Sequence, residues 1–464
     1  MRALDNPCRR RIAALPWLGV LLLLVGCASP RAYLGEPVDH VAGEDGYRSA
    51  AVAPGHTGDD LLFMVSLSGG GMRASAMAYG LFEQLAADHI ERADRRTRLL
   101  DQVDVLSAVS GGAVTAAYYT LYGDRLFDDF ERRFLDRDVS AALRRRVFFS
   151  PQNWLRLASS EFSRGDLYAE YFDRRLFRGA TFGDLDRSGR RPFLVINATD
   201  IGLAGRFDFT QDNFDLTCTD LARYPLSRAV AASSSVPVIS TPITLRNHAG
   251  RCGYRLPSWV DETLSVDDHG SPRYFRAAAL KARTDASRFA YLHLVDGALS
   301  DNLGARALLD ALRDTDDRIG LRRLPVPSAS PRVVYISVNA GDSKSSRVAM
   351  SRDPPDMFEI LRLMGTVPVD RYTAESRVQL REVLQEHARN MRAELYYIEI
   401  EIDALRDDAA LASLVELPTS FDLSRDKATA LRCATRRLLS ESGDYRRLLA
   451  DLGAVAVPTT SCAP

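Results

Sequence analysis

Two stretches decide the fold, and each is an apolar run that ends in glycines. The first is Leu61-Leu62-Phe63-Met64-Val65-Ser66-Leu67-Ser68-Gly69-Gly70-Gly71, and the second is Val103-Asp104-Val105-Leu106-Ser107-Ala108-Val109-Ser110-Gly111-Gly112. Each run has the length of a β-strand, its glycines predict a tight turn, and a small-residue pattern of helical period follows, to about residue 85 and over residues 113–122. Strand, glycine turn and helix in succession predict an α/β fold with a mostly parallel central sheet flanked by helices.

Further apolar runs extend this sheet. Residues 193–198, 291–295 and 333–338 predict three more strands, and their unbroken apolarity is typical of strands that are covered on both faces. The segments 124–190 and 241–290 are too long for plain connections, so we expect helices or a lid within them.

The chain divides into four expected regions. These are a signal peptide (1–26), a tether without sustained periodicity (27–59), the α/β domain (60–340) and a mainly helical C-terminal region (341–464). A strand-like run at 396–402 interrupts the helical pattern of the last region. The C-terminal region is thus expected to be a helical elaboration on the sheet.

Composition excludes several classes of protein. The 464 residues are 46% hydrophobic and 26% charged, with 60 basic and 61 acidic side chains. Such a chain is globular rather than disordered, collagenous or a coiled coil. A net charge near zero lacks the excess of Lys and Arg that nucleic-acid binding requires, so DNA and RNA are not expected partners.

The N-terminus is typical of an exported protein. Arg2, Arg9, Arg10 and Arg11 precede an apolar run over residues 12–26. That run is too short to cross a bilayer, which needs about 20 apolar residues, and it has the length of the apolar region of a signal peptide.

The apolar run ends in Leu24-Val25-Gly26-Cys27, which resembles the lipobox of bacterial lipoproteins. The resemblance implies cleavage before Cys27 and its lipidation, and hence a lipid-anchored protein on the periplasmic face of the cell envelope. Ala28 and Ser29 follow with no Asp directly after the cysteine, which by the lipoprotein sorting pattern favours the outer over the inner membrane. An ordinary secretory signal or a buried helix remains the alternative.

Four cysteines remain in the exported domain. In an oxidising compartment the sequence-near pairings are favoured, Cys218 with Cys252 and Cys433 with Cys462. The alternative is that some of them are free buried thiols. A zinc site is not expected, because no two of these cysteines have the spacing of a zinc motif.

Ser110 has the sequence context of a nucleophile. The segment Ala108-Val109-Ser110-Gly111-Gly112 resembles the nucleophile elbow Gly-x-Ser-x-Gly, with Ala108 in place of the first glycine. Small neighbours are needed because a serine on a sharp strand-to-helix turn leaves no room for large ones. The helix N-terminus also directs N–H groups and positive dipole at the hydroxyl. By itself the pattern is a weak signal, because a serine before a pair of glycines is commonly only a turn.

The first glycine turn is suited to hold developing negative charge. Gly69, Gly70 and Gly71 have no side chains, so their N–H groups can converge as an oxyanion hole requires. A phosphate-binding loop is the poorer alternative, because neither Gly-x-Gly-x-x-Gly nor the P-loop pattern is present. Ser68 is a rival nucleophile that we rank behind Ser110.

The base is expected to be an aspartate. Of the seven histidines, only His293 follows the sheet pattern, and there an inward-facing structural histidine is the commoner outcome. Asp296, in Asp296-Gly297-Ala298, comes directly after the strand 291–295. The end of an α/β strand is where active sites of such folds gather.

In combination, the three motifs resemble the patatin-like phospholipases. In that family a glycine-rich loop followed by Arg supplies the oxyanion hole, an elbow serine is the nucleophile, and the Asp of an Asp-Gly-Gly/Ala motif is the base, with no histidine. The blocks 197–200 and 229–237 also resemble the family's third strand and small-residue helix, in the family's order, and the resemblance covers about residues 60–310. The resemblance implies that Gly69, Gly70, Gly71 and Arg73 form the oxyanion hole. It also implies that Ser110 is the nucleophile and Asp296 the base.

The resemblance implies a lipid-anchored serine acyl hydrolase of phospholipid or lysophospholipid esters that needs no cofactor or metal. Two alternatives stay open: an acyltransferase or esterase that uses the same dyad, and a non-catalytic lipoprotein that binds lipid or a protein. Arg73 either pins the loop, meets a lipid phosphate or forms a surface salt bridge. The basic and aromatic stretch 143–149 with Trp154 forms either a surface for anionic headgroups or an amphipathic helix packed on the core.

Overall fold

The computed structural model describes residues 32–41, 43–49, 61–92, 95–237, 240–266, 268–313, 331–341 and 346–457. The predicted signal peptide (1–26) and Cys27, the expected site of lipidation, lie outside these residues.

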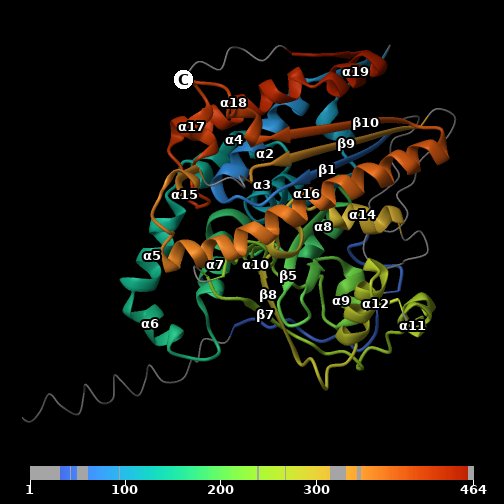
Figure 1. Cartoon of the computed structure of the whole chain (residues 1–464). Helices are drawn as coiled ribbons and strands as arrows, with labels where there is room; N and C mark the ends of the chain where they lie inside the picture. Colours follow the sequence, from blue (N-terminus) through green and yellow to red (C-terminus); the bar gives the residue numbers. More distant parts are fainter. Residues whose placement is uncertain are drawn as a thin grey trace, which may run out of the picture.

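A central sheet organises the described part of the chain, in the strand order β10-β9-β1-β4-β5-β8-β7, with β6 paired to β5 (Figure 1). The strands from β10 to β5 are parallel, whereas β6, β7 and β8 pair in antiparallel fashion. The predicted fold class, a mostly parallel sheet flanked by helices, is confirmed. The strands are β1 (Leu61–Leu67), β4 (Val105–Val109), β5 (Phe193–Asp200), β6 (Gly205–Asp208), β7 (Ile243–Arg246), β8 (Tyr291–Asp296), β9 (Arg332–Asn339) and β10 (Glu394–Glu401).

Every residue of β1, β4 and β5 is buried, because helices cover both faces of the sheet, as their unbroken apolarity predicts. Two helices begin at the glycine turns, α2 (Gly71–Ala87) after β1 and α3 (Ser110–Tyr122) after β4, and α2 packs against α3 and α18 (Arg425–Glu441). The long helix α16 (Met357–Met391) runs past the sheet and contacts α13 (Ala298–Asp301) and α14 (Arg306–Arg313) (Figure 1).

The two long segments between strands contain helices, as expected. The first holds α4 (Arg125–Phe130), α5 (Val139–Phe148), α6 (Pro151–Leu157), α7 (Arg164–Phe172) and α8 (Phe182–Ser188), with π-helical turns at Glu131–Leu135 and Asp173–Phe177. The second holds α11 (Ser258–Ser265) and α12 (Pro272–Arg283). Between these segments lie α9 (Gln211–Leu216) and α10 (Leu226–Ser233). None of the helices in the described ranges has the length and apolarity that crossing a bilayer requires.

The C-terminal region contributes to the central sheet itself. Its strand β10 lies parallel to β9 in register, and β11 (Ala454–Val455) joins a small sheet with β2 (His89–Arg92) and β3 (Arg95–Arg98). The C-terminal region also contains α15 (Ser346–Met350), α17 (Ala412–Val415), α19 (Gly443–Leu452) and a 3₁₀ turn at Ile402–Leu405. A second 3₁₀ turn, Leu99–Gln102, lies earlier in the chain, between β3 and β4. The described part of this region, residues 346–457, is therefore mostly helical, as predicted, and it also extends the central sheet.

Part of the expected tether packs on the domain, which corrects the prediction for residues 32–41 and 43–49. Tyr47 is buried and its hydroxyl donates to the carbonyl of Leu194, while Arg48 is buried against Asp212 and Asp215. The sequence pattern did not indicate this burial, because each side chain fits a site made by residues about 150 positions away.

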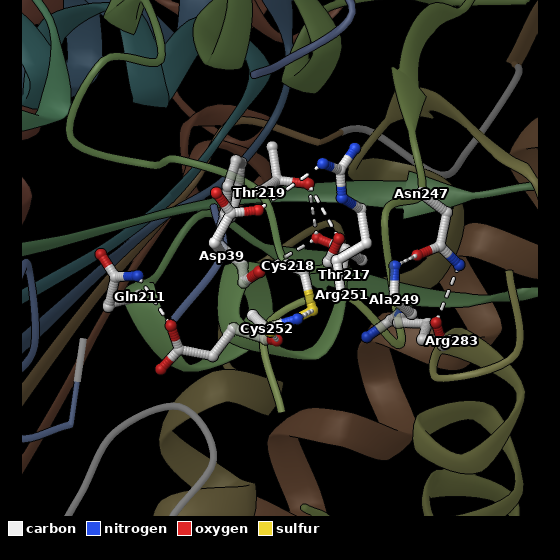
Figure 2. The surroundings of a disulfide bond; sticks show 12 residues. Asp39, Gln211, Thr217, Cys218, Thr219, Asn247, Ala249, Arg251, Cys252 and Arg283 are labelled. Carbon is white, nitrogen blue, oxygen red and sulfur yellow. Dashed lines mark hydrogen bonds and ion pairs between the residues drawn. A yellow bond between two sulfur atoms is a disulfide. The ribbon is translucent and has the colours of Figure 1, made fainter. Parts of the chain in front are cut away.

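A disulfide joins Cys218 to Cys252, the sequence-near pairing that we expected (Figure 2). It ties the turn after α9 to the start of the second long segment, next to the ion pair of Arg251 with Asp39. Cys433 is also disulfide-bonded, and Cys462, its expected partner, lies outside the described residues.

Candidate active site

Ser110 lies on a sharp turn between β4 and α3, where the sequence predicts a nucleophile elbow. Its φ angle is 49°, in the left-handed region that a residue with a side chain rarely adopts. The next residue must be glycine, because a Cβ on Gly111 would lie 1.8 Å from the carbonyl oxygen of Gly71. The two glycine turns are thus in direct backbone contact, and Ser110 lies beside the loop that follows β1.

The backbone of the elbow is held by a serine that sequence reasoning did not single out. The N–H of Ser110 donates to Ser233 Oγ at 2.8 Å, and that hydroxyl donates to the carbonyl of Asn197 at 2.6 Å. Ser233 stands in the small-residue block 229–237, so its hydroxyl was visible in the sequence but its partner was not. The N–H of Ser110 is therefore occupied and does not belong to an oxyanion hole.

Asp296 reaches the elbow from an antiparallel strand. Asp296 pairs with Ala198 of β5, and the neighbouring Asn197 pairs with Val109, the residue before the nucleophile. The aspartate thus ends β8 where the parallel strand β4 also ends. The following glycine is required here, since a Cβ on Gly297 would lie 2.3 Å from the carbonyl oxygen of Asn197.

Ser110 and Asp296 lie next to each other. Oδ1 of Asp296 accepts the N–H of Ala298 at 2.9 Å, and the Ser110 hydroxyl is close enough to the carboxylate to lower its pKa. Only 3% of Ser110 and 4% of Asp296 are exposed. Burial raises the pKa of Asp296 to about 6, and these two contacts offset part of that rise. A carboxyl group with this pKa is a stronger base than an exposed aspartate and is still ionised at neutral pH.

The loop after β1 offers two free N–H donors beside the dyad. Gly70 and Gly71 have φ angles of 139° and 61°, and within the described part of the chain neither N–H donates a hydrogen bond. The expectation for Gly69 is corrected, because its N–H donates to the carbonyl of Asn302 at 2.9 Å. Gly69 instead fixes the loop against the segment that follows Asp296.

Arg73 does not lie in the oxyanion hole, which corrects the role that the resemblance implies. It is 4% exposed, and its guanidinium donates to the carbonyls of Val415 and Leu417. Of the roles considered from the sequence, pinning the loop fits this contact. Its partners lie more than 300 residues away, so no local pattern could have indicated them.

The same C-terminal segment touches the glycine turn. The carbonyl of Ser420 accepts the N–H of Met72 at 2.8 Å, and a Cβ on Gly71 would lie 2.3 Å from that oxygen. The C-terminal region therefore helps to build the site, although its sequence carries no recognisable motif.

The two rival residues are engaged elsewhere. Ser68 is buried, donates to the carbonyl of Gly69 and accepts the N–H of Ala340, so its hydroxyl links the ends of β1 and β9. His293 is exposed on β8 and pairs with Thr244, so the expected inward orientation is wrong. Both observations leave Ser110 and Asp296 as the residues that the structure brings together.

Comparison with known families agrees with this geometry. The sequence profile described as patatin-like phospholipase matches residues 65–309, more than half of the chain. This chain belongs to that family. The predicted family is thus confirmed.

Other comparisons add little. Among solved structures, human GIVD cytosolic phospholipase A2 is similar with 14% identity and a TM-score of 0.30, over 59% of this chain and 45% of that chain. The patatin-like chain thus spans less than half the length of that protein, and a likeness of this size carries no argument. No curated protein matches the chain.

Proposed function

We propose that this patatin-like protein hydrolyses acyl esters of phospholipids or lysophospholipids through a Ser110–Asp296 dyad. The observation that carries the proposal is the position of the Ser110 hydroxyl beside a carboxylate that is 96% buried and has a raised pKa. A nucleophile and base in contact on a strained turn, beside two free glycine N–H groups, have the parts that acyl transfer requires.

The reaction proceeds in two balanced halves. Asp296 accepts the proton of Ser110 as Oγ attacks the ester carbon, and the N–H groups of Gly70 and Gly71 stabilise the oxyanion. Collapse expels the alcohol, which takes the proton from Asp296 and leaves an acyl-Ser110. Water then gives a proton to Asp296 and attacks the acyl group, and the released fatty acid leaves Ser110 with its proton restored.

We also propose that Cys27 carries a lipid that anchors the protein. The sequence Leu24-Val25-Gly26-Cys27 supports an anchor in the cell envelope, on the periplasmic face and in the outer rather than the inner membrane. An enzyme held at a bilayer is beside its substrate. Growth with labelled palmitate tests the anchor, and the label should be lost in Cys27→Ser.

Fatty-acid release tests the dyad. The full chain and its variants would be incubated with phospholipid and lysophospholipid vesicles in the presence of a calcium chelator, with products measured by mass spectrometry. Ser110→Ala and Asp296→Asn should each lower release by about 10³-fold or more, as removal of a catalytic group does, while Ser68→Ala retains activity. Circular dichroism would verify that each variant is folded.

A covalent probe separates the nucleophile from the substrate. A fluorophosphonate should add its phosphonyl group to Ser110 with loss of fluoride, and peptide mass spectrometry would locate it. Labelling of Ser110 without fatty-acid release would favour an acyltransferase or a different ester as substrate. Labelling of Ser68 instead would refute the assignment.

A further inference from the structure

The α5–α6 hairpin (residues 139–157) exposes apolar side chains that the fold does not use. Phe148 is 62% exposed, Phe149 80%, Trp154 52% and Leu155 69%, and no residue of α6 is buried. The hairpin lies at the outer edge of the molecule, away from the central strands (Figure 1). Clustered large apolar side chains of this kind mark an interaction surface rather than a core helix.

The hairpin is a built structure and not a loose loop. Asp138 caps α5 through the N–H of Ala141, and Ser150 caps α6, which starts at Pro151. Trp154 donates its indole N–H to the carbonyl of Val147 at 2.9 Å. The one polar atom of that ring is therefore satisfied inside the hairpin, and its hydrocarbon edge is left for a partner.

The charge of the hairpin selects an anionic partner. Residues 139–160 contain four arginines and no acidic residue, and Arg144 and Arg145 are exposed. Arg146 also lies near Arg174, whose positive charge contributes to the lowered pKa of Arg146 after the larger effect of burial. Aromatic side chains beside arginines are the composition that settles at the interface of an anionic bilayer.

The start of the described chain lies beside this surface. The N–H of Ala32 donates to the carbonyl of Glu161, four residues after α6 ends. Cys27 is five residues before Ala32, and five residues span at most about 18 Å. A lipid on Cys27 therefore enters the bilayer within about 18 Å of Ala32, which contacts the segment that follows the hairpin.

The hairpin also connects to the active site. The carbonyl of Phe421 accepts the N–H groups of Val139 and Ser140 at the start of α5, and the preceding Ser420 caps Met72 beside the glycine loop. A bilayer that contacts α5 and α6 therefore contacts elements that are linked, through Phe421 and Ser420, to the glycine loop beside the dyad.

We infer that the α5–α6 hairpin is the membrane-docking surface of this protein, inserting Phe148, Phe149, Trp154 and Leu155 at the interface of an anionic phospholipid bilayer. The position of the surface relative to the bilayer rests on the proposed lipidation of Cys27. Docking itself is independent of catalysis, so it can be tested in an inactive variant.

The test places a single tryptophan at the surface. The full chain has three tryptophans, and Trp17 is removed with the signal peptide, so Trp259→Phe leaves Trp154 alone in the anchored protein, and Ser110→Ala prevents consumption of the lipid. The protein would be reconstituted into phosphatidylcholine–phosphatidylglycerol vesicles that carry bromine on the acyl chains. The matched control moves the probe to α12 through Trp154→Phe and Phe275→Trp, because Phe275 is 64% exposed. Helix α12 lies on the other side of the molecule from α6 (Figure 1).

We expect brominated lipid to quench Trp154 strongly and the control tryptophan little, and aqueous acrylamide to do the reverse. Quenching of Trp154 by acrylamide alone, as for the control, would overturn the proposal. In the active protein, Phe148→Ser with Phe149→Ser should lower fatty-acid release from vesicles by about tenfold or more without changing hydrolysis of a water-soluble ester, since an apolar docking contact is lost.

The two proposals fail in different ways. Strong quenching of Trp154 in a protein that releases no fatty acid would support docking and reject the hydrolase. Fatty-acid release that depends on Ser110, without quenching and with full activity after the double Phe→Ser substitution, would support the hydrolase and reject docking. Phe275→Ser serves as the activity control and should change neither rate.

Discussion

Asp296→Asn should abolish activity and at the same time stabilise the protein. Burial raises the pKa of Asp296 from 3.8 to about 6, so the folded state prefers the protonated carboxyl. This preference is fully present below the unfolded pKa of 3.8 and is lost as the pH rises through about 6. Above that pH the ionised carboxylate costs the fold about 3 kcal/mol, at 1.36 kcal/mol per pKa unit.

An asparagine has nearly the same shape and no charge. Its side-chain oxygen can accept the N–H of Ala298, and its amide can donate to the Ser110 hydroxyl, so neither neighbour loses its partner. We therefore expect Asp296→Asn to raise the free energy of unfolding by about 3 kcal/mol at pH 7.5, with the gain shrinking towards zero near pH 4.

Urea unfolding of the detergent-solubilised full chain at several pH values measures this directly. Ser110→Ala is the control, because it also abolishes activity but leaves the buried charge in place and removes a hydrogen bond from it, so it should not be more stable than the parent. If Asp296→Asn is no more stable than the parent at pH 7.5, the carboxylate is not desolvated and the argument for an aspartate base without histidine fails.

Four further outcomes follow from the site and its support. Asp296, with a pKa of about 6, must be ionised to act as the base, so kcat/KM should fall as the pH drops through that value. A pH–rate profile of the parent protein measures this, and a flat profile down to pH 4.5 would contradict the prediction. Because the φ angle of 49° strains any side chain, Ser110→Gly should be about 1 kcal/mol more stable than Ser110→Ala by urea unfolding, and equal stabilities would exclude strain at the elbow. Gly111→Ala forces its Cβ into the glycine loop and should destabilise the protein by about 1–3 kcal/mol with loss of activity, whereas Gly365→Ala, at an open position in α16, should do neither. Replacing Cys218 and Cys252 together by serine removes a cross-link over 34 residues and should lower the free energy of unfolding by about 4 kcal/mol; a change below about 1 kcal/mol would show that the contacts around it suffice.

Local patterns predicted the parts of the site that local physics determines. A buried strand followed by glycines indicates a tight turn into a helix, and Ser110 and the loop after β1 lie where that rule puts them. The alternation of β8 would also have predicted the exposure of His293, since Leu292 and Leu294 are buried on either side of it. The error there was to treat the strand as uniformly buried.

Contacts between distant segments were beyond such patterns. Nothing near Gly69 indicates that the carbonyl of Asn302 accepts its N–H, and nothing near Arg73 indicates its carbonyl partners in the C-terminal region. The antiparallel direction of β8 is likewise a property of the assembled sheet. These features decide which glycines remain free as donors, so the donor set had to come from the structure.

Several features that lower the stability of the folded protein lie together at the dyad. Ser110 has a strained backbone and Asp296 carries a buried charge. Beside them, the N–H groups of Gly70 and Gly71 find no acceptor among the residues that the structure describes. A single substitution could remove each of these unfavourable features. Backbone strain of this kind persists only where many surrounding contacts hold the residue in place. Here the surroundings are strands that are buried along their whole length and a glycine loop held by the C-terminal region. Two of these features become favourable as the serine reacts: the proton of Ser110 neutralises the buried carboxylate, and the N–H groups of Gly70 and Gly71 gain the oxyanion as an acceptor. The buried charge and the open donors, which lower the stability of the resting fold, are therefore features that favour the transition state of acyl transfer.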